Sequence, residues 1–230
     1  MNKLLRTVTL IAAAGLLLAG CAAASRTAQE DAGVHAVAVV SLLNEAAPVR
    51  RLGFTVFGND QSSIDQGGKL QRIVSDTVTR RLKTARPQWT VKTGELDAAS
   101  LRRRSADANA AALADLARRL EVDQLFVLEE GMGENLPGQG VGLTFRTMGN
   151  TAGPNMVHAY VKLVVLDRSG KTLLVRGATR NNPQMTPPAE LGVRPDLGNL
   201  NDPAVRDRVS QALQRRLEAA VEEAMTRAGY

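Results

Sequence analysis

The sequence predicts a mixed α/β domain in which helices pack on both faces of a sheet. Residues 34–43 form an apolar, β-branched run without alternation, which is typical of a strand buried on both faces. Predicted strands and amphipathic helices alternate as far as residue 130, and a long amphipathic helix follows residue 202. We therefore expect one three-layer α/β (α+β) domain over residues 34–230, with a mixed sheet of about 6–7 strands.

The first half of the domain alternates strands with helices, as a parallel sheet requires. A second strand is expected at residues 51–57, after a loop at residues 44–48, and it should pair with the first strand. A helix is expected over residues 69–82, because its apolar side chains fall at helical spacing. After it we expect a strand at residues 89–93, a helix at residues 110–120 and a strand at residues 122–130. This order predicts parallel crossovers with helices on the sheet faces.

The second half of the domain should end in antiparallel strands. Residues 131–155 are rich in glycine, but apolar and polar residues alternate within them over residues 140–148 and predict a strand there. Residues 156–166 and 172–176 are expected to be strands joined by a hairpin loop at residues 167–170.

A long loop and a capped helix close the chain. Residues 181–201 contain four prolines and no periodic pattern, and a structureless loop of this length favours a binding or lid role. Asp202 is the predicted N-cap of the last helix, and Pro203 is its predicted first residue. The apolar stripe of this helix is formed by Val205, Val209, Leu213, Leu217, Val221 and Met225.

The N-terminal residues have the features of an export signal. Residues 7–20 form an apolar run of about 14 residues behind two basic residues, too short to span a bilayer. The run ends in Leu18-Ala19-Gly20-Cys21, which resembles the bacterial lipobox. The resemblance implies that the bond between Gly20 and Cys21 is cleaved, that the Cys21 thiol carries a diacylglycerol, and that the new amino group is acylated.

The lipobox divides the chain into three parts. Residues 1–20 would be the signal peptide, residues 21–33 a flexible tether, and residues 34–230 the periplasmic domain. Two or three acyl chains on Cys21 would anchor the protein stably in a membrane. Ala22, where an aspartate would favour the inner membrane, implies the periplasmic face of the outer membrane. The alternative is a secretory signal cut near residues 22–24, which would leave a soluble periplasmic protein.

Composition narrows the possible partners. Because Lys3 and Arg6 would leave with the signal, the mature chain keeps 27 basic and 23 acidic residues, a net charge of +4. Recurrent arginine pairs fit either a solvated surface or attraction to anionic phospholipid head groups and wall polymers. Aromatic residues make up only 3% of the chain, which leaves little for stacking on bases, so no nucleic acid is expected. Cys21 is the only cysteine, so no disulfide is expected.

The motifs point to no cofactor and no metal. Gly170-Lys171-Thr172 resembles the end of a phosphate-binding loop, but Val165 stands where the first glycine belongs, and a strand follows where a helix is needed. His35 and His158 lie in apolar strands without a ligand cluster near them. We therefore expect these imidazoles to be packed or hydrogen-bonded.

Carboxylates remain as candidates for catalysis. Glu129, Glu130 and Glu134 lie at the end of a buried strand, where ligands of open α/β sheets gather. Carboxylates at such positions are more often solvated charges at the end of a strand than catalytic groups. A small carboxylate-dependent envelope hydrolase is therefore kept as the alternative to a protein that is not an enzyme.

The order of elements is similar to that of a periplasmic domain found in several envelope proteins. The phrases that carry the resemblance are Val122-Asp123 before a strand and Leu166-Asp167 followed by Ser169-Gly170. The domain occurs in curli-channel-type lipoproteins, in lipoprotein activators of penicillin-binding proteins and at the amino terminus of the Tol-Pal translocation protein. The resemblance covers about residues 34–228 and implies a non-enzymatic module that binds proteins or forms oligomers. The tether is shorter than in the activators, and the alternating stretch is too brief for a barrel strand.

We therefore expect a lipid-anchored protein-interaction or assembly module whose partner is an envelope protein or a second copy. The expected working surface lies in two irregular segments, residues 131–155 and 181–201. Glycine-rich backbone can approach a partner closely, and a proline-rich loop loses less entropy on binding. The alternative is that both segments are insertions without a partner. The residues chosen to represent this surface are Phe145, Met148, Met185 and Leu191.

Overall fold

The computed structural model describes residues 31–53, 59–96, 98–101, 106–132, 138–148, 151–177, 184–186 and 188–230. The predicted mixed α/β fold with a long last helix is confirmed. The strands form two five-stranded sheets instead of one. In chain order the elements are β1 (Ala36–Ser41), β2 (Ala46–Leu52), β3 (Asp60–Asp65), α2 (Lys69–Ala85), β4 (Thr90–Gly94), α3 (Ala98–Leu101), α4 (Ala106–Leu120), β5 (Gln124–Glu130), β6 (Val141–Met148), β7 (Thr151–Ala159), β8 (Val161–Asp167), β9 (Thr172–Gly177), β10 (Gln184–Thr186), α5 (Pro188–Leu191) and α6 (Pro203–Ala228).

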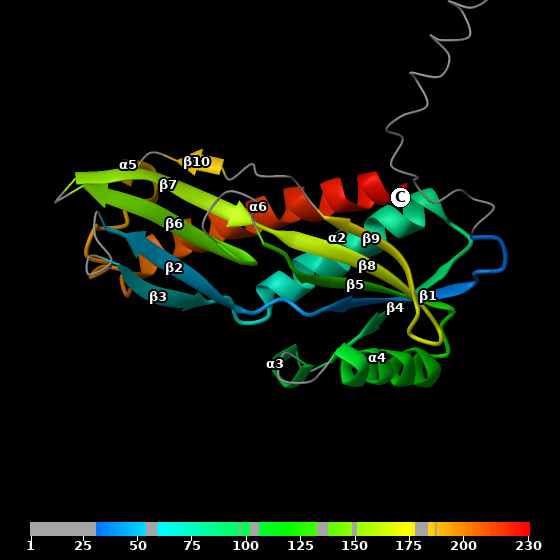
Figure 1. Cartoon of the computed structure of the whole chain (residues 1–230). Coiled ribbons are helices and arrows are strands. Elements are labelled where there is room, and N and C mark those ends of the chain that lie inside the picture. Colours follow the sequence, from blue (N-terminus) through cyan, green and yellow to red (C-terminus); the bar gives the residue numbers. More distant parts are fainter. Residues whose placement is uncertain are drawn as a thin grey trace, which may run out of the picture.

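Sheet A, in the order β4-β1-β5-β8-β9, has the predicted three layers. β1 is parallel to both β4 and β5, whereas β8 and β9 continue the sheet as antiparallel strands. α4 covers one face of the sheet, and α2 and α6 cover the other (Figure 1). Val37 and Val39 therefore pack toward α2 and α6, while Ala38 and Val40 pack toward α4. Burial on both faces explains why this strand is apolar without alternation.

Sheet B, in the order β10-β7-β6-β2-β3, was not predicted as a separate sheet. The predicted pairing of the first two strands is wrong, because β1 belongs to sheet A and β2 to sheet B. β2 begins at Ala46 instead of residue 51, and residues 54–57 of the predicted strand lie outside the described residues. Pro48 made this segment resemble a loop. The proline fits because the ladder to β6 begins only at Val49, so the missing N–H costs no bond to that strand.

Tyr160 separates the two sheets. The predicted strand over residues 156–166 divides there into β7 and β8. The Tyr160 amide donates to the carbonyl of Gly140 at 2.8 Å, and the Tyr160 carbonyl accepts from the amide of Gly131 at 2.7 Å. Its backbone therefore pairs with the loop that precedes β6, and the chain passes from sheet B directly into sheet A.

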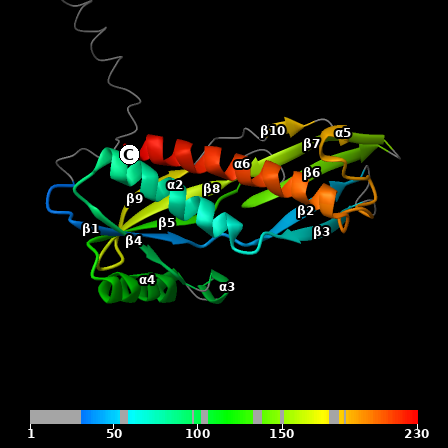
Figure 2. The same cartoon turned by 180° about the vertical axis from the view of Figure 1, so that it is seen from behind.

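α6 holds the two sheets together. Its 26 residues extend roughly 39 Å, and it packs against strands of both sheets (Figure 2). The predicted start is confirmed, since the Asp202 carboxylate accepts from the amide of Ala204 at 2.8 Å and Pro203 is the first residue. None of the described helices is both long and apolar enough to cross a bilayer.

Candidate functional site

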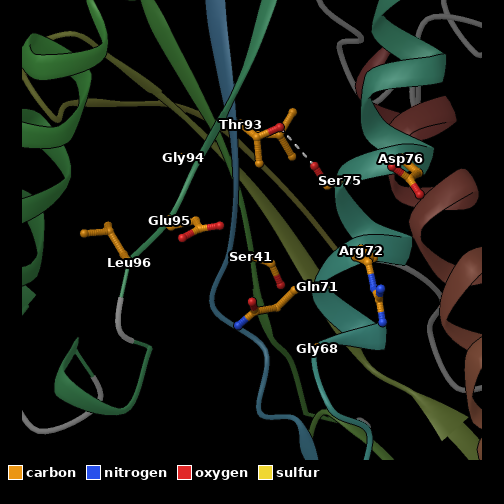
Figure 3. A pocket seen from close by; sticks show the side chains of 11 residues that line it. Ser41, Gly68, Gln71, Arg72, Ser75, Asp76, Thr93, Gly94, Glu95 and Leu96 are labelled. Atoms are coloured by element: carbon orange, nitrogen blue, oxygen red, sulfur yellow. Dashed lines mark hydrogen bonds between the residues drawn. The ribbon is translucent and has the colours of Figure 1, made fainter.

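A crevice of about 490 Å³ opens outside the carboxyl ends of β1 and β4. Its walls are the ends of these two strands and the first half of α2 (Figure 3). From β1 the chain leads through β2 and β3 to α2 on one face of sheet A, whereas from β4 it leads to α4 on the opposite face. Neighbouring strands whose connections go to opposite faces form a switch point, where open α/β sheets bind their ligands.

Polar side chains line this crevice. Ser75 on α2 points toward Thr93 on β4, and their hydroxyl oxygens lie 3.3 Å apart (Figure 3). Gln71 extends toward Ser41 at the end of β1, and Glu95 extends from the end of β4 toward α2. The described lining residues include no histidine, cysteine or lysine, so they form no nucleophile and base pair of the usual kinds. The groups present can bind a ligand through hydrogen bonds and charge.

The N-terminus of α2, at one side of the crevice, is occupied by a carboxylate of the chain itself. Glu45 Oε2 accepts from the amides of Gly68 and Leu70 at 3.0 and 3.3 Å, and Glu45 Oε1 accepts from the amide of Gln71 at 2.8 Å. Free amides at a helix N-terminus attract phosphate, but here they already have an anionic partner. These amides are therefore not available to a phosphate group.

Glycine at position 94 allows α4 to approach the floor of the crevice. A Cβ atom there would lie 3.1 Å from the side chains of both Leu116 and Leu120 on α4, tighter than ordinary packing allows. β4 therefore packs closely against α4 on one face of sheet A, while Thr93 faces α2 on the other face.

The carboxylates considered for catalysis lie apart from this crevice. Glu129 forms a cross-strand ion pair with Lys162 at 2.7 Å. Glu130 Oε1 accepts from the amide of Asn44 at 3.1 Å, which ties the end of β5 to the loop after β1. Glu134 lies outside the described residues. The structure therefore gives both described carboxylates structural contacts and brings neither to the crevice.

The residues chosen for an interaction surface are placed differently from what we expected. Phe145 and Leu191 are only 1% and 3% exposed and belong to the core, so they cannot contact a partner in this conformation. Met148 ends β6 and Met185 lies in β10, and their side chains are outside the described part of the structure. The two segments predicted to be irregular contain β6, much of β7, β10 and α5. β6 is the strand predicted over residues 140–148, whereas the first part of β7, β10 and α5 lie where irregular backbone was expected, because these segments build sheet B and cover it.

His158 is the predicted packed imidazole. Its ring is 1% exposed, stacks on Tyr160 with the ring centroids 5.0 Å apart, and has Nδ1 3.4 Å from the carbonyl oxygen of Met156. Burial lowers the pKa of His158 to about 4, and the positive charges of Arg50 and Arg216 contribute to the shift. His35 instead is exposed and precedes β1. Among the described residues no cluster of histidine, cysteine or carboxylate side chains could hold a metal ion.

The described chain begins with a clamp opposite the crevice. Gly20 and Cys21 lie outside the described residues, but Asp31 is buried, and its carboxylate forms an ion pair with Arg86 at 3.0 Å. The Tyr230 hydroxyl donates to the same carboxylate at 3.4 Å. The Arg86 guanidinium lies over the rings of Trp89 and Tyr230, 5.9 and 5.4 Å from their centroids. These contacts fix the start of the domain beside the C-terminal ends of α2 and α6.

No sequence pattern predicted the crevice. The available signal was the pair Gly67-Gly68 before a predicted helix, because consecutive glycines favour a tight turn. In the structure both glycines have positive φ. Comparison of the chain with protein-family profiles finds no match, and a search of curated proteins finds no similar sequence.

Proposed function

We propose that this chain is a lipid-anchored protein on the periplasmic face of the outer membrane, and that its α/β domain binds other proteins without catalysing a reaction. The lipobox at Leu18-Ala19-Gly20-Cys21 supports the anchor. The partner is an envelope protein or a second copy of the chain. The polar and charged side chains that line the crevice, which can bind a ligand through hydrogen bonds and charge, support a binding role.

The observation that carries this proposal is the position of the crevice relative to the anchor. A lipid on Cys21 would pull on the domain at Asp31, which is clamped to Arg86 just after the end of α2. The crevice is lined by the first half of this 17-residue helix, so it extends from roughly 15 Å to roughly 26 Å from the clamp along α2. The domain would therefore present the crevice on the side away from its attachment point, where a partner in the periplasm can reach it.

Mass spectrometry of the mature protein tests the anchor. We expect the N-terminal peptide to begin at Cys21 and to carry a diacylglycerol and a further acyl chain. The matched variant has Cys21→Ala and a standard secretory signal, and it should move from the outer-membrane fraction to the soluble periplasmic fraction. An unmodified N-terminus near residues 22–24, or a variant that stays with membranes after a high-salt wash, would contradict the anchor.

In vivo photo-cross-linking tests the binding function. A photoreactive residue is placed at the exposed positions Gln71 and Glu95 in the crevice, and at exposed Arg146 on β6 in sheet B. We expect a discrete adduct with one envelope protein or with a second copy of the chain. Absence of a specific adduct from all three positions would count against a protein-binding function.

A further inference from the structure

The edge of sheet A beside the crevice is an unpaired strand. β4 pairs with β1 only, and none of the described strands lies along its other edge. The amide of Thr90 donates to the carbonyl of His35 at 2.8 Å, on the side of β1. Because the backbone groups of successive residues in a strand point to opposite edges, Val91 and Thr93 direct their N–H and C=O groups to the free edge.

The side chains of Thr93 and Lys92, beside this edge, contact the helices on the two faces of sheet A. The Thr93 hydroxyl is turned to Ser75 on α2, and the Lys92 ammonium donates to the carbonyl of Leu120 at the end of α4. Thr93 lines the crevice between β4 and α2, so part of the free edge borders the crevice (Figure 3). An additional extended strand could lie there and pair with the backbone of β4.

The charges of the crevice favour one kind of strand. Arg72, Asp76 and Glu95 are exposed, and none of them forms an ion pair with another described residue. Among the described lining residues, two carboxylates and one guanidinium give a net negative charge. A segment that carries a basic side chain complements this charge, whereas an acidic or phosphorylated segment meets repulsion and finds the amides of α2 already occupied by Glu45.

We propose that an extended, basic peptide segment of a partner protein adds to β4 as a further strand, pairing with Val91 and Thr93 and directing a basic side chain toward Glu95 and Asp76. This inference rests on the proposed protein-binding function and names the surface and the chemistry of the partner. The backbone pairs supply affinity, and the charges beside them supply selectivity.

Proline at position 93 is the sharpest perturbation. Thr93→Pro removes the N–H that points to the free edge, but it leaves the bonds between β4 and β1 in place, and proline is tolerated on edge strands for this reason. Thr93→Ala is the matched control, because it removes the hydroxyl contact with Ser75 and keeps the N–H. Glu95→Lys tests the charge preference. Thermal unfolding of each variant establishes that it folds.

The probe is a set of synthetic heptapeptides recovered by phage display on the purified mature protein. We expect basic peptides whose affinity falls about tenfold or more with Thr93→Pro, changes little with Thr93→Ala, and falls with Glu95→Lys. Hydrogen exchange followed by NMR should show new protection of the Val91 and Thr93 amides when peptide is bound.

Several outcomes would overturn the inference. It is wrong if no recovered peptide binds the original protein more tightly than Thr93→Pro, or if Thr93→Pro and Thr93→Ala bind the peptides with equal affinity. It is also wrong if the peptides give new protection from hydrogen exchange only in sheet B. The cross-linking experiment separates this failure from failure of the proposed function. An adduct from Arg146 without one from Gln71 or Glu95 would leave the protein-binding function in place and refute the groove as its site.

Discussion

Burial of His158 couples the stability of the domain to pH. The imidazole is 1% exposed and has a pKa of about 4, against about 6.5 when it is solvated. Between these two values the unfolded chain binds a proton that the folded chain excludes. Stability is therefore full above pH 6.5 and falls as the pH drops toward 4. Two and a half pH units correspond to about 3 kcal/mol, of which roughly 2 kcal/mol should already be lost between pH 7 and pH 5.

Urea unfolding at pH 7 and pH 5 measures this loss. His158→Asn is the control, because an asparagine amide can replace the Nδ1 donor to the carbonyl of Met156 and does not titrate. Carboxylates that titrate in the same range affect both proteins equally, so the difference between their pH slopes isolates the imidazole. An asparagine variant that loses as much stability as the original protein would refute the assignment of the pH dependence to His158.

Two further perturbations test the packing of the described chain. Arg86→Met leaves the buried Asp31 carboxylate without the Arg86 cation and should lower the free energy of unfolding in urea by about 3 kcal/mol. Adding Asp31→Asn to the same chain should recover part of that loss, and a double variant whose effects simply add would argue against the clamp. Gly142→Ala places a Cβ 2.9 Å from both a backbone carbonyl and the buried imidazole and should cost about 1–3 kcal/mol, whereas Gly177→Ala has open space and should be neutral or slightly stabilising; equal melting temperatures for the two variants would contradict this packing.

Sheet A was predictable because its strands and the helices packed on it have strong hydrophobic patterns in their sequences. Both faces of β1 and β5 are covered, so their sequences are continuously apolar, and α2 and α6 show one apolar face each. The hairpin between β8 and β9 was visible from Asp167 and Gly170. The Asp167 carboxylate accepts from the amides of Ser169 and Lys171, and Gly170 has positive φ.

Sheet B was hidden because its strands lack such patterns. β3 reads DQSSID and buries only Ile64, since it is an edge strand with little apolar contact. β7 begins within a run of small and turn-forming residues that includes Gly153 and Pro154. β2 contains Pro48, and only the register shows that no bond to β6 is lost there. Long-range pairing, which a local pattern does not encode, decides each of these strands.

The candidate site was hidden for a related reason. Its residues are ordinary hydroxyl, amide and charged side chains, which have no spacing characteristic of a cofactor or a catalytic group. They converge only because β1 and β4 are neighbours in sheet A, although β2, β3 and α2 separate them in sequence. Of the glutamates chosen near the end of β5, Glu129 and Glu130 lie away from the crevice, where the strand partner Lys162 and the loop amide of Asn44 bind them.

The tether and the clamp together set where the proposed groove can act. If Cys21 carries lipid, the ten residues to Asp31 reach at most roughly 35 Å, and the 17 residues of α2 place the far end of the crevice roughly 26 Å beyond the clamp. The groove is then confined to about 60 Å from the bilayer, so a partner segment in that layer meets it at a raised effective concentration. Because the clamp holds Asp31 to Arg86 and Tyr230, the tether moves the domain without disturbing β4. Anchoring should therefore raise occupancy of the groove in the cell and leave its affinity for a free peptide unchanged.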